Sequence, residues 1–369
     1  MPVEVVSVRL DRRPVTSEAV PELYELFKLR ELPLAKTGVE IELRGVSTAV
    51  VNALRRAALD EMPGRALKVP PDGFSFELST DPFMLPEFVG QRLASIPLRC
   101  QISPDTVAGA RLQLDVTNHS ATALSVYAGD LTFIGAAPRE PLFNPTFRLA
   151  TLCPGKRIVI NGIYIDIGYG RDNATYNVVR RAALRHLDVA QHTDAEMREE
   201  YGKDGKRNPV ADLSGYKVSC MVADPRHHVL RAVVPATSPA PAETRAVFAD
   251  ACANIRERLQ LVAAAVEQAG APAGARHGIQ YTVIQLEGGL TEGVLQVPGE
   301  TYTIGELLKR TVFELEPGIS SVTSLVISHE NRLEVTIQHT DDVTKLLRAA
   351  IQRAIETFDT IRQGITDAR

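Results

Sequence analysis

A long amphipathic helix is predicted at the end of the chain, and its apolar stripe is the feature that most constrains the fold. Between Asp341 and Gly364, apolar side chains recur at intervals of three and four residues, which places them on one face of an α-helix. The same spacing predicts a second long helix over residues 243–269. A stripe of this length has to be covered by another element. Each long helix therefore needs a packing partner, and we expect this to be the short helix of the opposite half.

Each long helix ends a similar order of predicted elements. Residues 39–45 alternate apolar and charged side chains as a half-buried strand does, and a short helix capped by Ser47 or Thr48 follows and continues to Pro63. In the last third of the chain the pattern predicts two strands, a helix over 303–315, two more strands and the final helix. Each half therefore combines strands, one short helix and one long terminal helix.

The two short helices also align with each other at a constant offset. The paired positions are Leu54 with Leu308, Arg55 with Lys309, and Arg56 with Arg310. A repeat of this kind describes two similar halves that pack about a pseudo-twofold axis, as in a homodimer whose chains are joined.

Short alternating stretches separated by turn residues predict a mainly antiparallel β region that runs to about residue 167. Residues 192–209 are charged and predict a solvated loop. The expected fold class is therefore α+β. The expected domains are a first unit over 1–65 and 211–270, a β-rich insertion domain over 66–210, a linker over 271–280 and a second unit over 281–369.

Composition excludes several classes of function. The 41 basic and 45 acidic side chains give a net charge of -4, which provides no positive field for autonomous nucleic-acid binding. No apolar run is long enough to span a bilayer, so we expect an intracellular protein without membrane association. The 4 cysteines are scattered, so no metal or other cofactor is expected. The common nucleotide-binding, hydrolase and metalloprotease motifs are absent from the sequence, which removes the commonest catalytic sites that a sequence can indicate.

Three motifs carry a family resemblance. The segments GVSTAVVNALRRAALDEMP (45–63) and MLPEFVGQRLASIPL (84–98) resemble the signature of the α-like subunit of multisubunit DNA-directed RNA polymerases. In that family an N-[SA]-L-R-R helix precedes an E-F-x-x-x-R-L-x-x-I-P-L stretch. The segment GYGRDNATYN (168–177) is similar to a Gly-rich segment of the family that ends in Trp-Asn-Pro. Tyr176, Asn177 and Val178 stand at those three positions here.

The last third of the chain resembles the smaller, L-type partner of that subunit. The segment GETYTIGELLKRTVFEL (299–315) is similar to its D-H-T-[IL]-G-N-L-L-R helix, and RLEVTIQHT precedes the last helix as in the family. The usual His-Pro turn before the last strand is missing, and Ile327, Ser328 and His329 stand in that region. A D-type and an L-type unit in one polypeptide resemble the fused subunit of large nucleocytoplasmic DNA viruses.

The resemblance implies a non-catalytic scaffold subunit. Its two units would form an intramolecular equivalent of the α-like heterodimer that nucleates polymerase assembly and docks the second-largest, β-like subunit. The largest subunit and small zinc-binding assembly subunits would be further partners, and nucleotidyl transfer would belong to the two largest subunits. A viral source would place the protein in the virion and in the host cytoplasm, at the viral factory, or in the nucleus. The alternative is a free-standing β-rich protein-binding module unrelated to polymerase.

The resemblance also implies two sets of interface residues. The partner-interface residues are Asn52, Leu54, Arg55, Arg56, Glu87, Arg92, Tyr169, Arg171 and Asn177. The residues of the intramolecular dimer interface are Leu308, Phe313, Leu347, Ile351, Ile355, Phe358, Ile255 and Leu259. Arginine suits a docking surface because its planar fork binds carboxylates or backbone carbonyls. From the residues alone, the favoured interpretation of Arg55 and Arg56 is two solvated arginines on the exposed side of an amphipathic helix. Glu87 and Arg92 could pair with each other or hold backbone groups at a turn.

Overall fold

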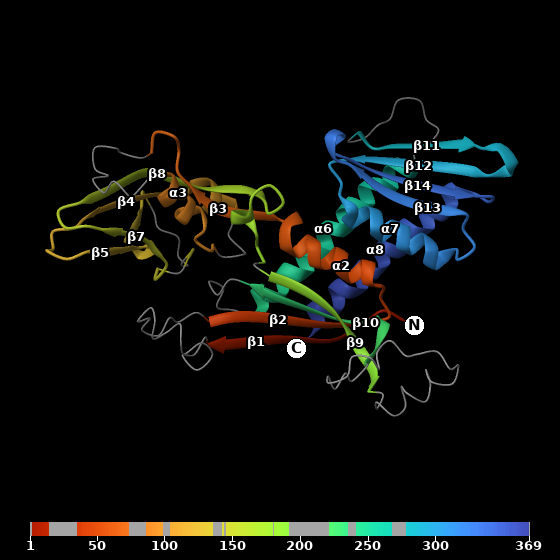
Figure 1. Cartoon of the computed structure of the whole chain (residues 1–369), viewed down its shortest axis with the longest axis horizontal. Coiled ribbons are helices and arrows are strands. Elements are labelled where there is room, and N and C mark those ends of the chain that lie inside the picture. Colours follow the sequence, from red (N-terminus) through yellow and green to blue (C-terminus); the bar gives the residue numbers. More distant parts are fainter. Residues whose placement is uncertain are drawn as a thin grey trace, which may run out of the picture.

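The chain folds around two separate hydrophobic cores. The computed structural model describes residues 2–14, 35–73, 86–98, 104–135, 142–143, 145–179, 181–191, 221–234, 241–267 and 278–368. Figure 1 places a group of strands on one side and, on the other, two sheets with the long helices between them. We call these the β-rich body and the helical body. The expected loop over 192–209, residues 74–80 of the expected β region and most of the expected linker lie outside the described residues.

One sheet of the helical body is built from segments of the first two thirds of the chain. Its strands are β1 (Glu4–Pro14), β2 (Ala35–Arg44), β9 (Arg181–Gln191) and β10 (Met221–Val234), and its helical segments are α2 (Thr48–Arg56), the π-helical turn η2 (Ala57–Glu61) and α6 (Pro241–Glu267). The strand order is β1-β2-β10-β9, with antiparallel pairs throughout. The alternation predicted for β2 is confirmed, because Val39, Ile41 and Leu43 are all buried.

The second sheet of the helical body comes from the last third of the chain. Its elements are β11 (Gln280–Gln285), η7 (Glu287–Gly289), β12 (Thr291–Pro298), α7 (Tyr302–Leu315), β13 (Ser321–Ile327), η8 (Ser328–Glu330), β14 (Arg332–His339) and α8 (Val343–Asp367). The strand order is β11-β12-β14-β13, again antiparallel. The Thr301 hydroxyl caps α7 by accepting from the backbone N–H of Thr303, and the Asp342 carboxylate caps α8.

The two sheets share one topology. In each sheet the third and fourth strands along the chain exchange places, so that the third strand lies at the edge. A short helix joins the second and third strands, and a long helix follows the fourth strand. The order of elements predicted for the second unit is confirmed in full. In the first unit, the strands β1 and β9 were not predicted from the sequence.

The β-rich body forms between η2 and β9. Its elements are β3 (Pro63–Lys68), α3 (Pro86–Ala94), α4 (Pro104–Gly109), β4 (Arg111–Thr117), β5 (Leu124–Tyr127), η4 (Ala128–Asp130), β6 (Leu131–Phe133), β7 (Arg148–Leu152), β8 (Arg157–Tyr169) and η5 (Ala174–Tyr176). Its sheets have the orders β3-β8-β4-β6 and β5-β7. Alternate residues such as Leu112, Leu114 and Ile160 fill its core, so the predicted mainly antiparallel β region is confirmed.

The long helices pack differently from the expectation. We expected each long helix to cover the short helix of the opposite half, and this is wrong: α6 packs along α8, and α2 packs against α7. Two apolar stripes of similar length bury more apolar surface against each other than either could against a helix of half its length. The stripes meet through fully buried side chains that include Phe248 and Leu259 of α6 and Leu347 and Phe358 of α8.

Candidate protein interface

The first motif forms α2, a helix that is buried on one side and partly exposed on the other. Leu54 is fully buried in the core of the helical body, so it cannot belong to an exposed partner surface, and its assignment is corrected. Asn52, Arg55 and Arg56 lie on the partly exposed side. The Nε of Arg55 donates to Oδ1 of Asn52 at 2.9 Å, and the Nη2 of Arg56 lies 3.7 Å from Oε1 of Glu61.

The third motif meets the end of this helix at Asp60. The backbone N–H of Arg171 donates to the carbonyl oxygen of Asp60 at 3.0 Å. A Cβ added at Gly170 would lie 2.8 Å from the Cα of Asp60 and 1.8 Å from Oδ1 of Asn177, so only glycine fits at this position. The pKa of Asp60 is raised above its ordinary value. Burial and the adjacent carboxylate of Glu61 raise it, and the opposing charges of Arg56, Arg55 and Arg171 do not fully offset them.

Arg171 links the β-rich body to two segments of the helical body, η2 and the turn before α7. Its guanidinium lies over the ring of Tyr169, 5.0 Å from the centroid. Its Nη1 donates to the carbonyl oxygen of Gly299 at 3.3 Å, just before the start of α7. Because its own backbone also bonds Asp60, Arg171 is an intramolecular contact as well as a predicted partner contact.

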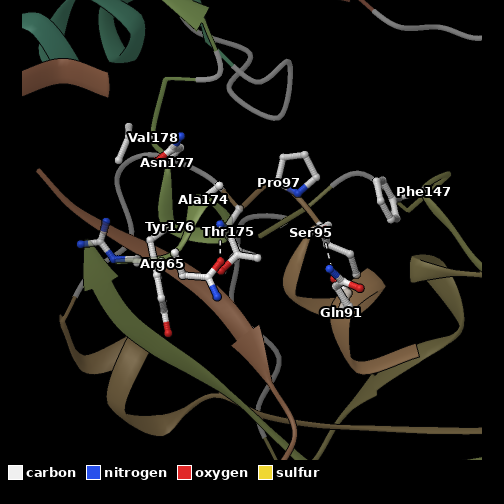
Figure 2. A pocket seen from close by; sticks show the side chains of 13 residues that line it. Arg65, Gln91, Ser95, Pro97, Phe147, Ala174, Thr175, Tyr176, Asn177 and Val178 are labelled. Atoms are coloured by element: carbon white, nitrogen blue, oxygen red, sulfur yellow. Dashed lines mark hydrogen bonds between the residues drawn. The ribbon is translucent and has the colours of Figure 1, made fainter. Parts of the chain in front are cut away.

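The second and third motifs line one groove, with a volume of about 530 Å³ (Figure 2). The end of α3 and the residues after it supply one wall, and η5 with its flanking residues supplies the other. Ile96, Pro97 and Leu98 of the second motif therefore face Asn173–Asn177 of the third across the groove. Tyr176 is buried here, and its hydroxyl donates to Asp166, which also pairs with Lys68.

The remaining residues of the predicted partner interface lie on α3. Glu87 and Arg92 are exposed, and within the described residues they form no ion pair with each other. The Nη1 of Arg92 donates to the carbonyl oxygen of Leu149 at 3.0 Å, which matches the alternative that this side chain holds a backbone group.

In the predicted dimer interface, Phe313 differs from the rest because it is 37% exposed. The other predicted members are buried, namely Leu308, Leu347, Ile351, Ile355, Phe358, Ile255 and Leu259.

A buried polar cluster joins η2, α6 and the start of α7, and none of its contacts was predicted from the sequence. Glu61 is only 4% exposed and accepts hydrogen bonds from the hydroxyls of Thr301, at 2.8 Å, and Thr303 at the start of α7. Arg258 of α6 donates to Glu61 at 2.6 Å and also pairs with Glu300. A carboxylate at the N-terminus of a helix is favoured by the helix dipole. These partners are distant in sequence and no motif spacing connects them.

Glu61 should make the stability of the helical body depend on acid pH. Burial alone would raise its pKa, but the charge of Arg258 and the hydrogen bonds from Thr303, Arg258 and Thr301 outweigh burial and leave the pKa below its ordinary 4.5. Glu61 therefore stabilises the fold above the unfolded-state pKa, and this contribution is lost as the pH falls through the lower folded-state pKa.

We expect the unfolding temperature of the wild-type chain to fall as the pH is lowered through the folded-state pKa of Glu61. In Glu61→Gln this dependence of the unfolding temperature on pH should be flatter. Thermal unfolding followed by circular dichroism between about pH 3 and 7 measures the dependence. Asp60→Asn is the control, because the pKa of Asp60 is shifted in the opposite direction. An acid-side slope that is the same for Glu61→Gln and the wild type would contradict the expectation.

Within the described residues, no helix is both long and apolar enough to cross a membrane. In the same part of the chain, no group of three or more His, Cys, Asp or Glu side chains could hold a metal ion.

Comparison with known proteins identifies the family. No family model matches the chain. The DNA-directed RNA polymerase RPB3-11 homolog of African swine fever virus is 34% identical over 350 residues, which cover 93% of this chain and 91% of the relative. The protein of the same name from a second isolate is 32% identical over 99% of this chain and 97% of its own length. The DNA-directed RNA polymerase subunit Rpo3 of Pyrococcus horikoshii is 30% identical over 41% of this chain and 56% of its own length. The chain therefore belongs to the family of RPB3-11 homologues, which are α-like subunits of DNA-directed RNA polymerase that occur in large DNA viruses.

Proposed function

We propose that the chain is a non-catalytic assembly subunit of a viral DNA-directed RNA polymerase, in which two α-like units form a pseudo-dimer and dock the second-largest subunit. The observation that carries the proposal is the shared topology of the two sheets of the helical body, each with one short and one long helix. The contacts between the units are also reciprocal. The helix α6 packs beside β11 of the second unit, and α8 packs beside β1 of the first. Such an exchange is typical of a twofold dimer.

The same repeat supports a division into domains. We infer that the β-rich body is an insertion in the connection between the short helix and the third strand of the first unit. The equivalent connection of the second unit is the short loop 316–320 between α7 and β13. Because β3 pairs with β8, and β9 pairs with β10, the insertion would run from about residue 63 to about residue 177. The expected bounds of 66–210 would therefore move. The linker proposed over 271–280 would end slightly earlier, because β11 already begins at Gln280, and the second unit would run from there to residue 369.

The docking surface would lie where the three motifs converge. Asn52, Arg55 and Arg56 present polar and basic groups beside Asp60, and the groove between α3 and η5 extends the surface over the β-rich body. A basic, partly exposed helix face fits an acidic patch on the second-largest subunit. We assign small zinc-binding assembly subunits and the largest subunit to the same complex. Catalysis would belong to the large subunits, so the chain needs no cofactor. The site of action would be the virion and the host cytoplasm or nucleus.

A single charge reversal tests this assignment. We expect Arg55→Glu to reduce co-purification of the second-largest subunit by about tenfold or more, because it places a carboxylate opposite an acidic patch. Arg55 is the better choice than Arg56, because Arg56 lies beside the buried Glu61 and its reversal would also disturb the core. The measurement is affinity purification of the tagged full-length chain from infected cells, with quantitative identification of co-eluting polypeptides and an assay for DNA-templated RNA synthesis.

The matched control is Arg353→Glu, a reversal at an exposed position of α8. It should leave co-purification at the wild-type level, and both variants should keep the wild-type unfolding temperature. Normal recovery of the large subunits with Arg55→Glu would contradict the docking surface. Elution of the wild-type chain alone would contradict the assembly role and favour a free-standing binding module.

A further inference from the structure

The edge strand β13 lacks the features that usually keep sheet edges from pairing. It lies at one margin of its sheet, next to α7 (Figure 1), and its sequence SVTSLVI contains no charged residue and no proline. Edge strands are normally protected by charges, proline, bulges or a covering segment. The equivalent edge strand of the first unit, β9, contains two arginines, a histidine and an aspartate. Among the described residues, no further segment forms backbone hydrogen bonds with β13 beyond its pairing with β14.

Apolar side chains are exposed on both sides of this edge. Leu325 of β13 is 53% exposed, and on α7 Tyr302 and Phe313 are 42% and 37% exposed. The helix α7 and the strand β13 lie side by side, and the hydroxyl of Ser324 in β13 donates to Glu306 of α7. Apolar side chains beside an open backbone edge are typical of a binding site rather than of a solvated margin.

The charges beside the edge are neutralised within α7. Lys309 pairs with Glu306 at 3.4 Å, and Arg310 pairs with Glu314 at 3.2 Å. The corresponding positions of α2 are Arg55 and Arg56, and Asn52 replaces the acidic residue at the position of Glu306. The edge of the second unit therefore favours an uncharged, apolar partner, in contrast to the basic face of α2.

We propose that β13 pairs with an extended, largely uncharged segment of another polymerase subunit, which adds a fifth strand to this sheet and packs apolar side chains against Leu325 and Phe313. This proposal rests on the proposed role in polymerase assembly. An extended backbone is the only group that can satisfy a row of strand N–H and C=O groups in register. A second copy of this chain fits less well. In a dimer, the β13 edge of one copy would meet the β13 edge of the other over only seven residues, about 23 Å of strand. A stable dimer buries about 1,200 Å² or more, which is more than so short a contact provides.

The other edge of the same sheet provides a matched comparison. The strand β11 also lacks charged residues, and its Ile284 is 49% exposed. It lies beside α6 of the first unit, however, so its margin is flanked by a helix within the chain. Ile284→Lys therefore changes an exposed apolar side chain of the same sheet without touching the β13 edge.

Hydrogen–deuterium exchange of residues 321–327 tests the proposal, with the tagged full-length chain measured alone and within the affinity-purified polymerase. We expect the outward-facing amides of β13 to exchange about tenfold or more slowly in the complex, because each gains a hydrogen bond. The double variant Thr323→Lys with Leu325→Lys, at two exposed positions, should lose this protection, and Ile284→Lys should keep it.

Each other outcome overturns the proposal in a distinguishable way. If the large subunits co-purify but the β13 amides exchange at the same rate alone and in the complex, the inference fails and the assembly role stands. If slow exchange is already present in the isolated chain and increases with protein concentration, the occupant is a second copy. If no large subunit co-purifies with the wild-type chain, the assembly role fails, and with it the proposed pairing.

Discussion

Replacing Arg258 with alanine is expected to lower the free energy of unfolding of the helical body by about 3 to 5 kcal/mol, which is the usual cost of removing one partner from a buried ion pair. The guanidinium is 16% exposed and pairs with Glu61 and Glu300, whose side chains are 2% and 12% exposed. Without Arg258 both carboxylates remain in a poorly solvated site. Glu61 would keep its hydroxyl donors Thr301 and Thr303 and the longer ion pair with the partly exposed Arg56 at 3.7 Å, which compensate its buried charge only in part.

Arg256 is the matched control because it lies on the same helix and also joins the two units. Its Nε lies 3.4 Å from Asp359 of α8, but the two side chains are 36% and 49% exposed. Solvent screens such a pair, so Arg256→Ala should cost about 1 kcal/mol or less. Urea unfolding followed by circular dichroism measures both variants. Equal losses for the two would contradict a special role of the buried cluster.

Much of the helical body could be predicted from the sequence because its elements have strong local periodicity. The stripe of α8 and the alternation of β14 repeat over several turns or residues, and both elements form nearly where they were predicted. The strands β1 and β9 were missed because their sequences contain several charged residues, which weakens alternation as a signal. Their places are decided by pairing with strands distant in sequence, and local patterns carry no information about such pairing.

The candidate interface was predicted in part for a different reason. The motifs placed Arg55, Arg56 and Arg171 in one set, and the structure brings all three close enough to act on Asp60. Burial could not be predicted at single positions, so Leu54 was included although it is fully buried. Glu61 was not singled out, because its partners Arg258 and Thr303 come from α6 and α7 and no spacing rule links them.

The two long helices determine whether the proposed pseudo-dimer can hold together, and Phe358→Ala should show this. Phe358 of α8 is fully buried in the core that both units share. Removing its ring leaves a cavity between closely packed helices, which costs about 3 to 5 kcal/mol for a buried phenylalanine. Phe313→Ala removes the same ring from a position that is 37% exposed, so it should cost about 1 kcal/mol or less. Urea unfolding of the full-length variants compares the two.

Because both residues were predicted for the dimer interface, a large loss for Phe358→Ala alone would place that interface between α6 and α8. Equal small losses would mean that the units are held together elsewhere, with the Glu61 and Arg258 cluster as the remaining contact.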